Sequence, residues 1–290
     1  ISGNTIVRNR GANSIFGGGI NAWGGLLNIT NNYIADNAAA YGGGIYSSGT
    51  GINISHNRIH GNYIENATPK HGSALYIVSS NYEYNTVTGG TGTSLIYKSG
   101  GGTIRYNNFV HKSETYLLYQ GGGGSGTSDF ENNWWGTTDT TNLDALIYDW
   151  NDDVTQAKVD YTPFLTAPNT TAPPSPPQNV AAQTGPTTIT LAWGANPEAD
   201  IAGYKVHYDT DAAGYPYATS TDVGNLTSYN LTGLSTGTTY YTAVSAYDSD
   251  GNESWVSSDV SATAEATATS LAFLSEPAGS TAGSSLATQP

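Results

Sequence analysis

A six-residue pattern recurs six times between Ile1 and Trp135, and it restricts the fold of this part of the chain more than any other feature. The pattern is an apolar or aromatic residue, any two residues, Asn, any residue and a second apolar residue. Its Asn residues stand 22 to 28 positions apart and are Asn4, Asn32, Asn57, Asn85, Asn107 and Asn133. Repeats of this length that consist of short strands and turns are typical of a solenoid, in which each coil packs only on its neighbours.

Each of the first five repeats holds a second apolar anchor behind small or turn-forming residues. These anchors are Ile20, Ile45, Leu75, Ile96 and Leu118. The spacing between anchors leaves room for three short strands per repeat. No segment of residues 1–135 shows a long 3.6-residue apolar period, which disfavours helical repeats. We therefore predict a parallel β-helix whose coils stack about 4.8 Å apart.

The repeated Asn is expected to sit at a sharp bend between two inward apolar residues. Asn tolerates the left-handed backbone conformation, and its amide can satisfy nearby backbone groups. In stacked coils each amide can also donate to the Asn of the next coil, as in cross-β amide ladders. A shorter second column follows five residues later and comprises Asn9, Asn37 and Asn62. We interpret both columns as structural.

With these motifs, residues 1–165 resemble the right-handed parallel β-helix superfamily, which has the pectate-lyase-like fold. The closing segment from Asn132-Asn133-Trp134-Trp135-Gly136-Thr137 to Leu165 also resembles the end of such proteins. The resemblance implies a short capping helix at about Leu143 to Trp150, which covers the edges and core of the last coil. This fold hosts lyases, hydrolases, esterases, adhesins and phage spikes, so the resemblance leaves the function open.

The second half of the chain has a different composition. Five of the twelve residues 166–177 are Pro, which predicts an extended, stiff linker. In residues 178–264 short alternating strands, such as 188–193, 204–208 and 241–247, indicate a β-sandwich. This segment resembles a fibronectin type III domain, which implies a core position for Trp193 and a tyrosine corner at Tyr240. The loop from Asp248 to Ser254 is interpreted as a plain turn and not as a calcium loop.

Residues 265–290 resemble the first strand of a bacterial Ig-like repeat. They either belong to a domain that is cut off here or form a strand donated to another sheet. The chain contains no Met, and Ile1 already stands in the register of the Asn pattern. We therefore expect this sequence to be an interior or mature portion of a longer polypeptide.

The composition excludes several classes of function. A formal net charge of −14 disfavours binding to nucleic acid or to anionic membranes. There is no Cys for disulfide or thiol chemistry, and no apolar run approaches the length of a membrane span. A β-rich chain with only 11% charged residues suits an extracellular or cell-surface location.

Four tyrosines form the first candidate site. Tyr46, Tyr76, Tyr97 and Tyr119 each follow an inward anchor directly, so they should point outwards on four consecutive coils. Such a stripe can simply stabilise the sheet through cross-strand contacts. It can also contact a glycan or a protein partner. Since the face is uncharged and the chain is acidic, a neutral glycan fits better than a polyanion.

Charged groups give a second set of candidates. Glu83, Arg105 and Glu131 fall on three successive coils and are the one charged row that suits a lyase or hydrolase, although a salt-bridge ladder explains them equally well. The spacing of His56, His60, His71 and His111 does not suggest a metal site. Asp149, Asp152 and Asp153 could hold calcium, but carboxylates at a helix end need no ion.

From these observations we predict an extracellular structural or adhesive protein without catalytic activity. The β-helix would act as a rigid rod and the sandwich as a spacer. The expected partners are neutral polysaccharide, neighbouring surface proteins or other copies of the chain, with which it would form a fibre or layer. No cofactor is expected. The alternative is a polysaccharide lyase or glycoside hydrolase with the pectate-lyase-like fold.

Overall fold

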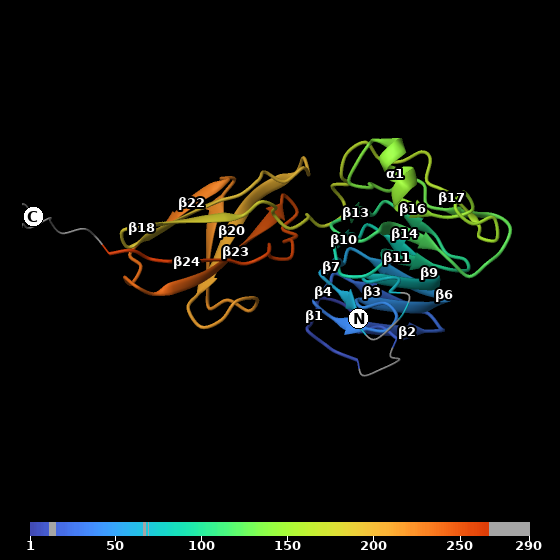
Figure 1. Cartoon of the computed structure of the whole chain (residues 1–290), viewed down its shortest axis with the longest axis horizontal. Helices are drawn as coiled ribbons and strands as arrows, with labels where there is room; N and C mark the ends of the chain where they lie inside the picture. Colours follow the sequence, from blue (N-terminus) through green and yellow to red (C-terminus); the bar gives the residue numbers. More distant parts are fainter. Residues whose placement is uncertain (12–15, 66–67, 69, 267–290) are drawn as a thin grey trace, which may run out of the picture.

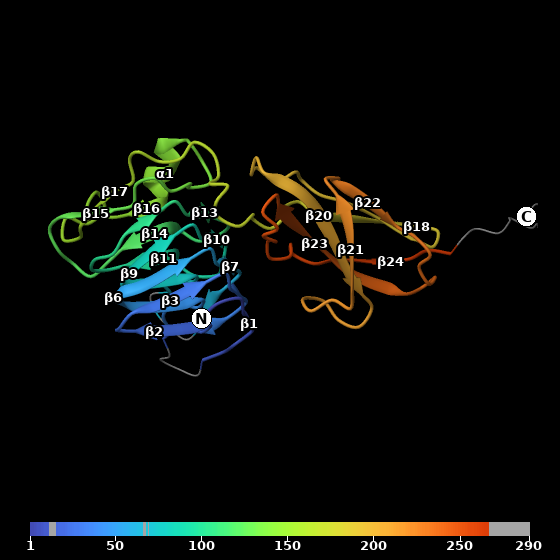
Figure 2. The same cartoon turned by 180° about the vertical axis from the view of Figure 1, so that it is seen from behind.

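The computed structural model describes residues 1–11, 16–65, 68 and 70–266. It contains a parallel β-solenoid followed by a β-sandwich, which stands beside the solenoid (Figures 1 and 2). The chain is therefore nearly all β, as the sequence predicts. No helix in the described part of the chain has the length and apolar character of a membrane span.

One face of the solenoid is a five-stranded parallel sheet. Its strand order is β1 (Thr5–Val7), β4 (Tyr33–Ala35), β7 (Arg58–His60), β10 (Thr86–Thr88) and β13 (Asn108–Val110). The middle residue of each strand points inwards and is in register with the next one, so that the core column reads Ile6, Ile34, Ile59, Val87 and Phe109. The flanking residues of each strand face outwards, because successive side chains alternate across a strand.

A second parallel sheet forms the opposite part of each coil. It contains β2 (Ile20–Trp23), β3 (Leu27–Thr30), β6 (Ile45–Ser55), β9 (Leu75–Glu83), β11 (Ser94–Lys98), β12 (Ile104–Arg105), β14 (Tyr116–Gln120) and β16 (Ile147–Tyr148). In the second and third coils the two expected strands merge into the long strands β6 and β9. Two short pairs complete the solenoid, β5 (Ala38–Ala39) with β8 (Tyr63–Ile64) and β15 (Thr127–Asp129) with β17 (Lys158–Asp160).

The predicted Asn ladder is continuous through all six positions. Each side-chain amide donates to the Oδ1 atom of the next Asn, at distances of 3.1, 2.9, 3.0, 2.9 and 3.0 Å from Asn4 to Asn133. The five members from Asn32 onwards are fully buried. The shorter column continues from Asn9 through Asn37 to Asn62, at 2.9 and 3.0 Å. Both columns are therefore internal hydrogen-bond ladders.

The bend beside the ladder differs from the prediction in one respect. The left-handed conformation falls on the residue before the ladder Asn, with φ of 56° at Asn31, His56 and Tyr84 and 62° at Tyr106. The expectation that the ladder Asn itself takes this conformation is wrong. Its amide is needed for hydrogen bonds to backbone carbonyls and to the next coil, and the preceding residue turns the chain instead.

The capping helix also lies earlier than expected. The helix α1 spans Thr140–Leu146, and Asp139 caps it by accepting hydrogen bonds from the amides of Thr141 and Asn142. Leu143 of this helix is fully buried. The predicted span of Leu143 to Trp150 is wrong because Ile147 and Tyr148 continue the sheet as β16, in register with β14. The chain thus adds one more strand to the larger sheet directly after the helix.

The sandwich consists of two antiparallel sheets. One contains β18 (Ala181–Gly185), β19 (Thr188–Ala192) and β22 (Ser228–Leu231); the other contains β21 (Thr219–Gly224), β20 (Ile201–Asp209), β23 (Thr239–Asp248) and β24 (Val260–Thr263). Trp193 packs in the core, and the Tyr240 hydroxyl accepts a hydrogen bond from the amide of Ser235 at 3.1 Å. Both positions agree with the predicted fibronectin type III pattern. The tail prediction for residues 265–290 lies almost wholly outside the described residues.

The sandwich packs against the outer face of the five-stranded sheet. Trp255 and Val256 form an apolar cluster with Ala35 of β4 and with the flanking Val7 and Tyr33. The carbonyl of Glu253 accepts hydrogen bonds from the Tyr33 hydroxyl at 2.8 Å and from Arg58 Nε at 2.6 Å. The sandwich therefore does not extend the solenoid axis but projects sideways from the middle of it (Figure 1).

The Pro-rich segment is part of this joint. Residues 172–177 are buried, the carbonyl of Pro173 accepts a hydrogen bond from the Thr86 hydroxyl, and the amide of Ser175 donates to Glu198. Just before it, Asn108 of β13 exchanges two hydrogen bonds with the backbone of Asn169. The segment is thus hydrogen-bonded to both the solenoid and the sandwich, and it holds the two modules together.

Candidate functional site

The predicted tyrosine stripe forms on the outside of the larger sheet. Ile45, Leu75, Ile96 and Leu118 point into the core, so the residue after each of them points outwards. The register pairs Tyr46 with Tyr76, Tyr76 with Tyr97, and Tyr97 with Tyr119. One further pair extends the row, because Tyr119 is in register with Tyr148 of β16.

The rings stack along the solenoid axis. Centroid distances from Tyr46 to Tyr148 are 5.3, 4.2, 6.0 and 4.3 Å, and the planes of neighbouring rings differ by 4 to 22°. At the first coil the ring of Trp23 stacks on Tyr46 at 5.3 Å. We call this row the aromatic ridge, and it comprises Trp23, Tyr46, Tyr76, Tyr97, Tyr119 and Tyr148.

Exposure varies along the aromatic ridge. Tyr46 is only 5% exposed because Phe16 and Trp23 lean against it, whereas Trp23 is 60% exposed. Burial and the neighbouring phenols raise the pKa of Tyr76 far above its usual value, and they raise the pKa of Tyr119 to about 12. These hydroxyls are therefore protonated at neutral pH, and they can act both as donors and as acceptors.

Three members of this surface are not indicated by the sequence pattern. Tyr148 follows the inward Ile147 in the same way as the other tyrosines, but the expected helix concealed it. The prediction considered only the residue directly after each inward anchor, which in the first coil is Asn21. Trp23 lies two residues further on and was therefore not included. His71 comes from a loop and packs against Tyr119 with its ring tilted by 34°, and the ring centroids are 3.9 Å apart.

A second aromatic row, which the sequence argument also missed, lies at the left-handed bends. His56 stacks on Tyr84 at 5.3 Å, and Tyr84 stacks on Tyr106 at 5.4 Å. These residues precede the ladder positions, so the register of the Asn column brings them together. The row could have been found from the sequence by aligning the residue before each ladder Asn.

The charged row forms a surface ion-pair cluster. Arg105 forms an ion pair with Asp129, which the sequence argument did not include, and lies 3.9 Å from Glu131. Glu83 stands beside Arg105 in the register of β9 and β12. Hydrogen bonding to Asp129 raises the pKa of Arg105. A guanidinium held in this way is poorly suited to act as a base, which is the role that a lyase would require.

The Asp residues near the cap serve the local backbone. The buried carboxylate of Asp149 accepts hydrogen bonds from the amides of Asn151 and Val159, both at 2.8 Å. Asp152 accepts from the amide of Asp149, and Asp153 accepts from Thr155. Within the ranges that the structure describes, no three His, Asp or Glu side chains gather in a way that could hold a metal ion.

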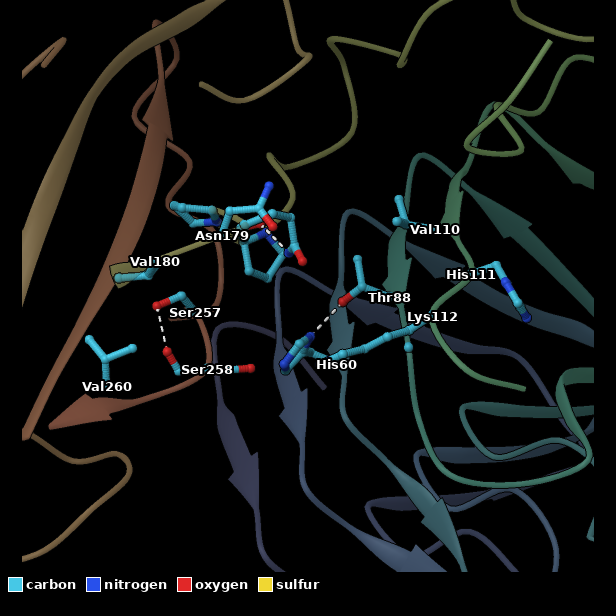
Figure 3. Close-up of a pocket in the computed structure, with 14 residues that line it drawn as sticks. His60, Thr88, Val110, His111, Lys112, Asn179, Val180, Ser257, Ser258 and Val260 are labelled. Atoms are coloured by element: carbon cyan, nitrogen blue, oxygen red, sulfur yellow. Dashed lines mark hydrogen bonds between the residues drawn. The ribbon is translucent and has the colours of Figure 1, made fainter. Parts of the chain in front are cut away.

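A cavity of about 200 Å³ lies at the joint between the modules (Figure 3). His60, Thr88 and Val110 line one side at matching positions of β7, β10 and β13. Pro176 and Val260 are among the residues that face them from the linker and the sandwich. The sequence indicated no such site, because its two sides are far apart along the chain.

The polar groups of this cavity are held in place. His60 Nδ1 lies 2.6 Å from Thr88 Oγ1, and the Lys112 side chain extends towards the His60 ring (Figure 3). Burial and the nearby charge of Lys112 lower the pKa of His60 to about 4, so the imidazole is neutral at pH 7. The cavity therefore combines a neutral imidazole with one ammonium group.

Comparison with known proteins identifies the second module. Residues 175–272 match the family model of the fibronectin type III domain. The chain thus carries a β-solenoid followed by a fibronectin type III domain. A Kelch domain-containing protein of Saccharolobus solfataricus is 40% identical over 82 residues, which make up 28% of this chain. The chain covers 11% of the length of that relative.

Solved fibronectin type III domains resemble part of the chain. The FN1-FN3 domains of chicken CNTN1 cover 38% of this chain at 22% identity, with a TM-score of 0.30 and 35% of their own length matched. The FN5 domain of Drosophila Lar covers 32% at 25% identity, with a TM-score of 0.28 and 99% of its length matched. The fn3 domain of human contactin 1 covers 35% at 19% identity, with a TM-score of 0.31 and 86% of its length matched.

Proposed function

We propose that this chain is a structural or adhesive part of an extracellular protein and that its aromatic ridge contacts a neutral glycan. The architecture supports a scaffold role, because two β modules are fixed to each other by a buried joint. The observation that carries the glycan contact is the row of six stacked rings along one face of the solenoid. Neighbouring surface proteins or other copies of the chain are further partners in this proposal.

The stacking decides how the aromatic ridge would contact a sugar. Neighbouring tyrosines cover each other's ring faces, so they offer ring edges and hydroxyl groups. Protonated phenols can donate to and accept from sugar hydroxyls without introducing charge. Trp23 stands at one end of the row and is 60% exposed, so its ring is open to an apolar sugar face. We therefore assign the main stacking contact to Trp23 and the hydrogen bonds to the central tyrosines.

Charge supports a neutral ligand over an acidic one. The chain has a formal net charge of −14, which disfavours the approach of polyanions. No ridge member carries a charge at neutral pH. A neutral polysaccharide would meet neither repulsion nor a buried unpaired charge on this face.

Binding of the intact chain to a panel of neutral and acidic polysaccharides tests the proposal. Trp23→Ala should weaken binding of a neutral glycan at least about tenfold, since truncation of a Trp that acts as a binding hot spot costs about 2 kcal/mol or more. Tyr97→Phe removes a hydroxyl and should weaken binding by a smaller factor. Trp150→Ala is the matched control, because this Trp is 48% exposed and lies outside the aromatic ridge.

Two results would contradict the proposal. One is equal binding by Trp23→Ala and Trp150→Ala, and the other is the absence of binding to any neutral glycan in the panel. Release of unsaturated or reducing sugars by the wild type, abolished in Arg105→Ala, would replace the proposal with the enzyme alternative.

A further inference from the structure

The cavity at the joint differs in charge from the rest of the molecule. The chain has 23 Asp and Glu residues, yet none of the 14 residues that line this cavity is acidic. Three of them are basic, namely His60, His111 and Lys112. The carboxylates of the joint, Asp36 and Asp259, line an adjoining space that shares His60, Lys112, Ser257 and Ser258 with this cavity.

Lys112 is the source of positive charge in the cavity. Its ammonium group forms no ion pair with any residue that the structure describes. His60 is hydrogen-bonded to Thr88 and is neutral, and His111 is directed to Glu114 with their side chains 3.9 Å apart. The wall of the cavity thus contains one ammonium group and no carboxylate, and Asp36 and Asp259 of the adjoining space form no ion pair with that ammonium group among the described residues.

Apolar side chains form part of the cavity wall, beside the polar Gln178, Asn179, Ser257 and Ser258. Val110 stands on the solenoid side, while Val180, Val260, Pro176 and Pro177 stand on the side of the linker and sandwich. A volume of about 200 Å³ corresponds to roughly seven water molecules at their share of liquid volume. An oligosaccharide is too large for this space, whereas a small organic molecule fits. Binding sites with a few polar groups in apolar walls occur preferentially between domains.

We propose that the joint cavity binds a small monocarboxylate with an apolar body. The carboxylate pairs with the Lys112 ammonium, and the apolar body packs between Val110 and Val260. This site is separate from the aromatic ridge and takes a different class of ligand. Because the ligand touches both modules, its binding stabilises the joint by mass action.

Ligand-observed NMR on the intact chain tests this site, with benzoate as the probe and benzamide as its neutral analogue. Benzoate should bind to the wild type, and benzamide should bind at least about tenfold more weakly. Lys112→Gln should weaken benzoate binding about tenfold, since it removes a charge-assisted hydrogen bond. It should leave benzamide binding unchanged.

Two further variants separate the local contact from other effects of charge and folding. Lys112→Arg keeps the positive charge and should retain benzoate binding. Lys70→Gln removes a charge from an exposed residue outside the cavity and should bind like the wild type. The proposal is overturned if the wild type does not bind benzoate, if benzamide binds equally well, or if Lys112→Gln and Lys70→Gln have the same effect.

Discussion

Substitution of a buried ladder Asn by Ala should lower the free energy of unfolding of the solenoid far more than the same substitution of an exposed Asn. The Asn57 side chain is fully buried and makes five hydrogen bonds. Its Oδ1 atom accepts from the backbone and side-chain amides of Asn32, at 3.0 and 2.9 Å. Its Nδ2 group donates to the carbonyls of Ile29 and Ser55 and to Asn85.

The cost of Asn57→Ala follows from what each partner loses. The backbone amide of Asn32 loses its acceptor inside the core, and a buried donor without a partner costs about 1–3 kcal/mol. Some other partners keep a second hydrogen bond, as the Asn32 side chain does with Thr30, so each of these losses costs about 1 kcal/mol or less. We expect the free energy of unfolding of the solenoid to fall by about 3–5 kcal/mol.

Asn53 in β6 provides a matched control four residues before Asn57. It also stands in a column, between Asn28 and Asn81, with side-chain hydrogen bonds of 3.3 and 3.0 Å. This column is exposed, so water replaces the lost partners. Asn53→Ala should therefore lower the free energy of unfolding by less than about 1 kcal/mol.

Urea denaturation of both variants measures the free energies, and hydrogen exchange locates the loss. The amide of Asn32 should exchange faster in Asn57→Ala and should keep its wild-type protection in Asn53→Ala. Equal destabilisation by the two substitutions would refute the view that burial of the ladder, and not the presence of an Asn column, stabilises the coils.

Three other features of the fold have measurable consequences. Gly43→Ala places Cβ 2.3 Å from the carbonyl oxygen of Tyr63, so it should lower the stability by about 3 kcal/mol, whereas Gly101→Ala meets no atom within 4 Å and should be neutral in thermal unfolding. Equal melting temperatures of the Gly43→Ala and Gly101→Ala variants would contradict the close packing at Gly43. Trp255→Ala should weaken the joint by about 3 kcal/mol and increase the radius of gyration in X-ray scattering; an unchanged radius would argue against the joint. The pKa of His60 falls from 6.5 to about 4 on folding, so its contribution to stability is complete above pH 6.5 and is lost as the pH falls towards 4. The loss should reach at most about 3 kcal/mol and should disappear in His60→Gln, and an equal loss in that variant would exclude His60 as its source.

Periodic features of the solenoid could be predicted because each coil repeats the same environment. An Asn at the same place in six repeats indicates one column, and an aromatic residue after each inward anchor indicates one stripe. Two of the errors, the missed Tyr148 and the misplaced helix, occurred where the period ends. Tyr148 belongs to β16, the last strand of the sheet. The predicted helix included this residue, because the resemblance of the closing segment placed the helix too far along the chain.

The candidate sites could be predicted in part. The register brings Tyr76, Tyr97 and Tyr119 together as expected, but it does not show that Tyr46 is covered by Phe16 and Trp23. Arg105 lies next to Glu131 as expected, while its partner Asp129 comes from the neighbouring coil at a position that the row did not include.

The sequence by itself determined the coils, because their inward residues and ladder amides recur at regular intervals and each contact lies one repeat away. Only the tertiary structure decided how the two modules meet. The hydrogen bond from Tyr33 to Glu253 joins residues 220 positions apart, and no period links them. Contacts of this kind depend on the shapes of the surfaces of both folded modules. The sideways position of the sandwich and the cavity beside His60 are therefore visible only in the tertiary structure.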